Sequence, residues 1–85
     1  MPEISRFLGI VIRMFFNDHP PPHFHVEYQE FEAKIDLERF ELVEGELPNR
    51  IRALVVRWAE LHRDELMENW LRREQKKQLQ KINPL

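Results

Sequence analysis

The sequence predicts an α+β fold in which a three- to four-stranded antiparallel sheet, built from β-hairpins within residues 4–43, carries one long C-terminal helix, about residues 49–78, on one face. Two patterns predict it. In the first half of the chain apolar and polar residues alternate, which is the period of strands. In the second half apolar residues recur every three or four positions, which is the period of an amphipathic helix. A chain of 85 residues suits a single domain, 1–85, with a thin core.

The first predicted strand covers residues 4–16, and both of its faces are rather apolar, as in a central strand. The tract 17–22 must be a connection, because its three prolines cannot donate hydrogen bonds to a sheet. Strands over 23–28 and roughly 31–37 follow, and residues 38–47 form either a short fourth strand or a loop.

The register of the second hairpin is specified by its apolar side chains. A turn centred on Gln29 and Glu30 places all of them on one face, with the pairs Tyr28–Phe31, Val26–Ala33 and Phe24–Ile35. A two-residue turn prefers Gly or Asn, so Gln-Glu is a poor fit at this point.

The predicted helix begins at Pro48 or Asn49, either of which suits a helix start. Its apolar stripe consists of Ile51, Leu54, Val55, Trp58, Leu61, His62, Leu66 and Trp70. The basic residues at its end complement the helix dipole. After the helix, Ile82 and Leu85 are expected to fold back onto the core.

Composition excludes several classes of protein. The absence of cysteine excludes disulfides and thiolate metal sites and favours a reducing compartment. No apolar run is long enough to span a membrane and no signal peptide is recognisable at the start, so we expect a cytoplasmic protein. Net charge is −2, but acids predominate over residues 27–46 and bases over 71–81. Each segment is either a solvated surface or a contact for a charged partner.

Three of the four histidines lie within residues 19–25. The two-residue period of a strand puts His23 and His25 on one face, and the register above sets Asp36 opposite His23. Asp18 and His19 belong to the loop, and an extended proline tract would carry His19 about 12 Å from His23.

This constellation favours two chemistries. Imidazole and carboxylate groups are sufficient ligands for a divalent metal, with the candidate set Asp18, His19, His23, His25 and Asp36. Alternatively, His23 and His25 serve as general acid and base for phosphodiester cleavage, with Arg13 as an anion contact. A purely structural interpretation, in which both histidines are half-exposed strand residues, stays open.

Several short motifs spread over nearly the whole chain resemble the bacterial "domain of unknown function 4160" family. They are Ile4-Ser5-Arg6-Phe7, Gly9-Ile10, Arg13-Met14, Asp18-His19, Pro21-Pro22-His23-Phe24-His25-Val26, Glu46-Leu47-Pro48, Leu61-His62, Glu65-Leu66, Asn69-Trp70 and Lys81-Ile82-Asn83-Pro84-Leu85. Members of that family often have Asn at the position of Pro20 and Gly at the position of Gln29.

The resemblance implies the toxin half of a bacterial toxin–antitoxin pair, whose antitoxin is of the "domain of unknown function 2442" type. Its histidine motif points to Asp18, His19, His23 and His25, and its late motif to Asn69. Three functions follow: a toxin with metal-dependent or histidine-based phosphodiester chemistry, a non-catalytic binding or transcription-associated module using the basic C-terminal end, and a metal-binding regulator. A homodimer and a nucleic-acid partner are both compatible with the chain.

Overall fold

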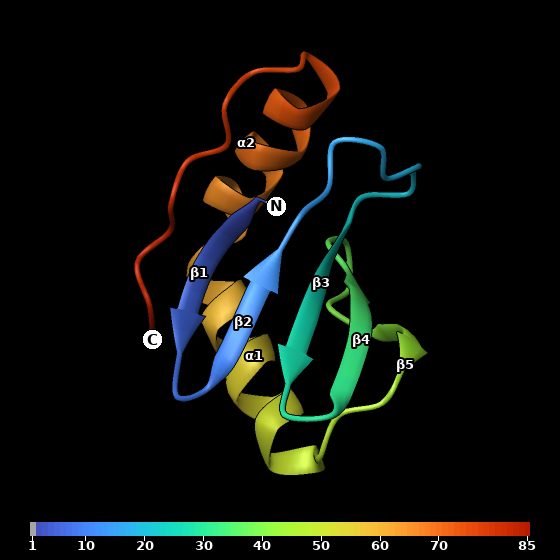
Figure 1. Cartoon of the computed structure of the whole chain (residues 1–85), viewed down its shortest axis with the longest axis vertical. Helices are drawn as coiled ribbons and strands as arrows, with labels where there is room; N and C mark the ends of the chain where they lie inside the picture. The colour runs from blue at the N-terminus through green and yellow to red at the C-terminus, as the bar shows by residue number, and fades with distance from the viewer. Residues whose placement is uncertain (1) are drawn as a thin grey trace.

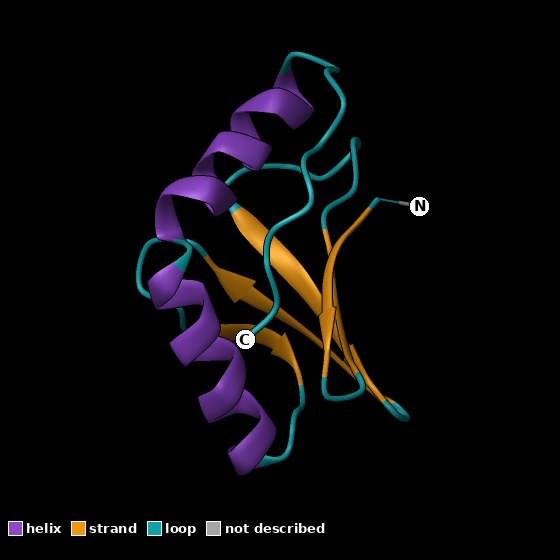
Figure 2. Ribbon diagram, turned by 90° about the vertical axis from the view of Figure 1, so that its left-hand side faces the viewer, coloured by secondary structure: helices purple, strands orange, loops and turns teal. Residues whose placement is uncertain are grey.

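The computed structural model describes residues 2–85, and within them it contains five strands followed by two helices. One antiparallel sheet holds the strands in sequence order, β1 (Glu3–Phe7), β2 (Ile10–Arg13), β3 (His23–Tyr28), β4 (Phe31–Asp36) and β5 (Leu42–Gly45) (Figure 1). Helices α1 (Asn49–Leu61) and α2 (Arg63–Glu74) follow each other along one face of the sheet (Figure 2). The α+β class is therefore confirmed.

The predicted count of three to four strands is wrong, because the segment 4–16 forms a hairpin. Leu8 and Gly9 have φ angles of 52° and 80° and make the turn between β1 and β2. Two positive φ angles suit the twist of a tight hairpin. Leucine is unfavourable in this left-handed conformation, so the pair Leu-Gly carries only half of the usual turn signal.

The predicted register of the second hairpin is confirmed at every position. Cα partners across β3 and β4 include His23 with Asp36 and His25 with Lys34. Gln29 begins the turn with a φ of 54°, so the position that often holds glycine in the resembled family has a left-handed backbone. The fourth segment is the strand β5 and pairs with β4.

The predicted single helix over 49–78 is also wrong, since it is interrupted at His62 and ends at Glu74. The backbone of His62 has φ −120° and ψ 28°; its N–H donates to the carbonyls of Trp58 and Ala59, and its carbonyl accepts the N–H of Leu66. Asp64 and Glu65 then lie in the first turn of α2, where negative charge is favourable. Pro48 is the N-cap of α1.

The core lies between the sheet and the helices and includes Phe24 and Trp58, both fully buried. After α2 the chain runs back beside β1 (Figure 1). Ile82 is buried as expected and donates its N–H to the carbonyl of Ile4, whereas Leu85 stays exposed. No helix within residues 2–85 combines the length and apolarity that a bilayer-crossing segment needs.

Candidate metal centre

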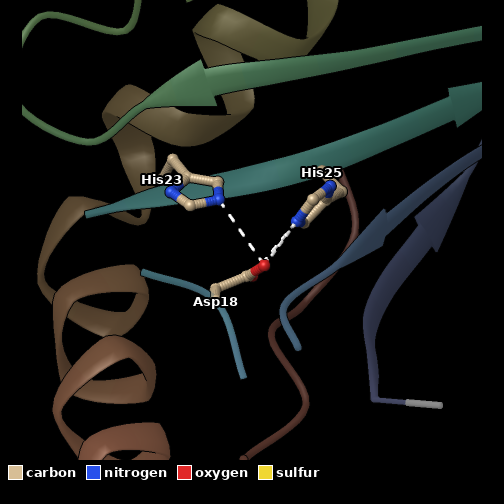
Figure 3. A group of neighbouring side chains, drawn as sticks. All are labelled: Asp18, His23 and His25. Atoms are coloured by element: carbon tan, nitrogen blue, oxygen red, sulfur yellow. Dashed lines mark hydrogen bonds and ion pairs between the residues drawn. The ribbon is translucent and has the colours of Figure 1, made fainter. Parts of the chain in front are cut away.

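Asp18, His23 and His25 converge at the end of the sheet where the β2–β3 loop meets the start of β3 (Figure 3). Nε2 of His25 lies 3.1 Å from each carboxylate oxygen of Asp18, and Nε2 of His23 lies 3.7 Å from Oδ1 of the same carboxylate. One ligand atom from each residue lies within 4.8 Å of the other two. The group could therefore hold a metal ion with small adjustments.

The orientation of His23 is fixed by its other ring nitrogen. Nδ1 lies 2.9 Å from the carbonyl oxygen of Pro21, and because a carbonyl only accepts, Nδ1 must carry the proton of that hydrogen bond. In the neutral ring Nε2 is then a lone pair facing the Asp18 carboxylate. This nitrogen is buried and has no hydrogen-bond partner in the described chain. Two acceptors facing each other call for a cation or a proton between them.

A proton on Nε2 of His23 satisfies this requirement poorly. A charge-assisted N–H···O hydrogen bond spans about 2.7–2.9 Å. The distance from His23 to Asp18 is 3.7 Å, and the carboxylate is closer to His25. A cation bound by all three residues would satisfy the lone pair directly. Histidine ligands commonly donate their second ring N–H to a backbone carbonyl, as His23 does to Pro21.

The carboxylate of Asp18 is held by a tight turn of the loop. Its Oδ2 accepts the N–H of Phe15 at 3.0 Å, while its own N–H donates to the carbonyl of Phe15 at 3.1 Å. The ring of Phe15 meets the ring of His25 edge-on, with centroids 4.7 Å apart. One aromatic residue thus contacts two of the candidate ligands.

Strand parity alone does not describe the surroundings of His23. The imidazole of His25 is partly exposed, but His23 is buried, and its ring centroid lies 5.4 Å from that of Trp70 in α2. Helix α2 extends past the end of the sheet toward the loop (Figure 1), and its Trp70 lies against the ring of His23. The purely structural interpretation assumed two half-exposed histidines, whereas the structure has one buried ring and one partly exposed ring.

Two predicted metal ligands lie outside the group. His19 is exposed in the proline-containing loop. Asp36 is opposite His23 as predicted, but its Oδ1 accepts the backbone N–H groups of Glu38 and Arg39 at 2.9 and 2.6 Å. A short side chain at the end of a strand commonly caps the following turn, and this use engages the Asp36 carboxylate, which is not part of the three-residue group.

Arg13 is the Cα partner of His25 across β2 and β3. Its Nε donates to Oε2 of Glu27 at 3.1 Å. Lys34 occupies the equivalent position on β4 and lies 3.3 Å from Oε1 of Glu44. His25 is therefore flanked on the sheet surface by two cations, each already paired with a glutamate.

Three supporting residues were not predicted as part of this site: Phe15, Trp70 and Arg73. Arg73 had been assigned to the basic tail, yet it is buried and donates to the loop carbonyls of Phe16 and Asp18. The available signal was the helical stripe, because a spacing of three to four residues from Leu66 passes through Trp70 to Arg73. The basic tail also has less unpaired positive charge than expected, since Arg72 forms an ion pair with Glu68.

Asn69, selected through the late motif of the resembled family, has a structural position. Its side-chain amide donates to the carbonyl of Gln80 at 2.9 Å and accepts the N–H of Gln80 at 2.8 Å. Trp58 donates its indole N–H to the carbonyl of Asn83. Asn69 therefore fastens the C-terminal segment to α2 and does not reach the candidate ligands.

The fold and the site define an α+β protein with a two-histidine, one-carboxylate group at the end of its sheet. The sequence model of the family described as "Domain of unknown function (DUF4160)" matches residues 9–71, about three quarters of the chain. The chain belongs to this family, which confirms the resemblance found in its motifs. No curated protein and no solved structure matches the chain.

Proposed function

We propose that Asp18, His23 and His25 bind one divalent transition-metal ion, and that the protein uses this centre to cleave phosphodiester bonds as the toxin of a toxin–antitoxin pair. The observation that carries the metal site is the orientation of His23. Its Nδ1 is committed to the carbonyl of Pro21, and this leaves a buried Nε2 directed at the carboxylate of Asp18.

The distances support a first-row transition metal. Metal–ligand bonds of about 2.0–2.2 Å place neighbouring ligand atoms roughly 2.8–3.6 Å apart in octahedral or tetrahedral geometry. The separations of 3.1 and 3.7 Å from Asp18 to His25 and His23 are close to that range. Two imidazoles and one carboxylate suit zinc, iron or manganese better than the oxygen-seeking Mg²⁺.

Three protein ligands leave at least one coordination position for water. A divalent metal at such an open site acidifies bound water and polarises a phosphoryl oxygen, which is the chemistry of hydrolysis. Arg13 lies beside His25, and a guanidinium has N–H donors beyond the Nε that it gives to Glu27. These donors match a phosphate oxygen pair, so Arg13 is the residue we expect to contact the substrate anion.

The toxin role rests on the family resemblance, which implies a neighbouring antitoxin of the "domain of unknown function 2442" type. That partner is expected to be a protein that blocks the centre or the substrate path to it. The acidic surface over β3 to β5 offers a contact for basic groups on such a partner.

Elemental analysis of the purified protein tests the metal site. We expect about one equivalent of zinc, iron or manganese per chain, and less than a tenth of that in Asp18→Ala. His19→Ala is the matched control, because His19 belongs to the same loop but lies outside the group. Protein that is isolated without metal and also fails to bind added zinc, manganese or nickel would reject the site.

Growth arrest on induced expression tests the toxin role. Arrest is expected with the unchanged protein and with His19→Ala, and it should disappear with His23→Ala or His25→Ala. Arg13→Gln should retain the metal and reduce the arrest, since it removes the anion contact and the ion pair with Glu27 but none of the three ligands. Full toxicity of the His23→Ala, His25→Ala double variant would reject both histidines as catalytic residues.

A further inference from the structure

Arg73 is a buried cation without a close carboxylate partner. It lies in the last turn of α2 and its side chain is 5% exposed. The nearest carboxylate contact is 3.9 Å away, at Glu74, whose side chain is about half exposed. Burying a guanidinium under these conditions is costly unless other groups compensate. The groups that do compensate belong to the candidate metal centre.

Two backbone carbonyls of the site loop accept hydrogen bonds from Arg73. Its Nη1 lies 3.0 Å from the oxygen of Phe16 and 2.7 Å from the oxygen of Asp18. Both carbonyls belong to the turn that orients the Asp18 carboxylate. Hydrogen bonds between Phe15 and Asp18 close this turn. The hydrogen bonds from Arg73 hold the same turn against helix α2.

The aromatic ring of Trp70 connects Arg73 to a second candidate ligand. The guanidinium carbon of Arg73 lies 3.7 Å from the ring centroid of Trp70, which is a cation–π contact. The same ring packs against His23. Helix α2 thus contacts the main chain of Asp18 through Arg73 and the imidazole ring of His23 through Trp70.

Nε of Arg73 is buried and has no hydrogen-bond partner among residues 2–85. A buried N–H group without a partner costs free energy, so an arginine is not the least costly residue for filling this position. An apolar side chain at this position would pack on Trp70 without that penalty. What it could not supply is the pair of hydrogen bonds to Phe16 and Asp18.

We propose that Arg73 is a positioning residue of the metal centre, which holds the Asp18 carboxylate within coordinating distance of His23 and His25. This inference rests on the proposed metal site. Outer hydrogen-bond partners of metal ligands typically change metal affinity by about 10- to 100-fold, because they orient the ligand before the metal binds.

Cobalt binding to the full chain tests this inference. Co²⁺ reports its ligand geometry through visible absorption bands, so affinity and geometry are measured in one titration. For Arg73→Met we expect an affinity about 10- to 100-fold below that of the unchanged protein, with a shifted visible spectrum. Arg72→Met is the matched control, because Arg72 is the neighbouring arginine and contacts Glu68 and the carbonyl of Gln78. It should leave affinity and spectrum unchanged.

The outcomes separate the two proposals. If the unchanged protein binds no cobalt, the metal site itself is rejected and the role of Arg73 with it. If Arg73→Met is folded by circular dichroism and binds cobalt with unchanged affinity and spectrum, the positioning role is overturned and the metal site stands. Should Arg73→Met fail to fold, Arg73→Lys takes its place. An intermediate loss, about three- to tenfold, is then expected because lysine restores the charge without the guanidinium geometry, and unchanged binding would overturn the inference.

Discussion

Both oxygens of the Asp18 carboxylate lie 3.1 Å from Nε2 of His25, although the two residues belong to different elements of the fold. Asp18 is in the β2–β3 loop and His25 is within β3. A metal bound between them would tie the loop to the sheet. Metal binding should therefore raise the free energy of unfolding, so it can be measured by protein stability as well as by metal content.

Metal addition should raise the unfolding temperature. At a free Zn²⁺ or Co²⁺ concentration of 100 times Kd, the free energy of unfolding increases by about 2.7 kcal/mol. For a chain of this size that is roughly 10–20 °C. Differential scanning calorimetry measures it, and an excess of chelator should reverse it. Mg²⁺ at equal concentration is the control, since it prefers oxygen ligands; an equal shift with Mg²⁺ would contradict a two-histidine site.

Removing the buried His23 should lower the metal affinity far more than removing His19, which belongs to the neighbouring loop but lies outside the group. For His23→Ala we expect a loss of at least about 100-fold in the Co²⁺ association constant, because a direct ligand disappears. His19→Ala should stay within about twofold of the unchanged protein. Competition with a coloured chelator measures both values. Equal losses of affinity in the two variants would contradict direct ligation by His23 and would attribute the effect to the loop as a whole.

The turn between β3 and β4 should accept glycine with a gain in stability. Gln29 has φ 54° and is exposed, so Gln29→Gly relieves the left-handed strain without losing a packed side chain. We expect the free energy of unfolding to rise by about 0.5–1 kcal/mol in urea denaturation. Glu30→Gly is the matched control, since Glu30 is not at positive φ and glycine there only adds freedom to the unfolded chain. A gain in both variants would contradict this account.

The C-terminal segment should depend on Asn69. Asn69→Leu removes both hydrogen bonds that the buried Asn69 amide makes to the backbone of Gln80, and we expect a loss of about 1–3 kcal/mol in the free energy of unfolding. Gln80→Ala keeps the same backbone groups and should change stability by less than about 0.5 kcal/mol. Both variants should bind metal with the affinity of the unchanged protein once folded. A selective loss of metal in Asn69→Leu would give Asn69 a role in the site.

The second hairpin was predictable because a single register satisfies all of its apolar residues. A shift of one residue would move Phe24 and Val26 to the histidine face, so parity specifies both the pairing and the common side of His23 and His25. The first hairpin was not predictable in this way. Both faces of segment 4–16 are apolar, and neither parity nor the pair Leu8-Gly9 indicates a reversal.

The interruption at His62 escaped detection because the apolar stripe stays in phase across it, from Trp58 to Leu66. The acids Asp64 and Glu65 were the local sign of a new helix start. In the site, strand parity placed Asp36 correctly opposite His23 but could not predict that the following turn would use its carboxylate. The apolar spacing of the helix extends from Leu66 and Trp70 to Arg73, but the charge of an arginine favours a surface position, so its burial was not predictable.

The most direct test of the metal centre is anomalous diffraction from crystals of the protein grown with Zn²⁺ or Mn²⁺. The account predicts one strong peak, about 2.0–2.2 Å from Nε2 of His23, Nε2 of His25 and a carboxylate oxygen of Asp18. It also predicts that Nδ1 of His23 keeps its hydrogen bond to the carbonyl of Pro21. A metal-saturated crystal without a peak between these three residues, or with its peak elsewhere, would contradict the account.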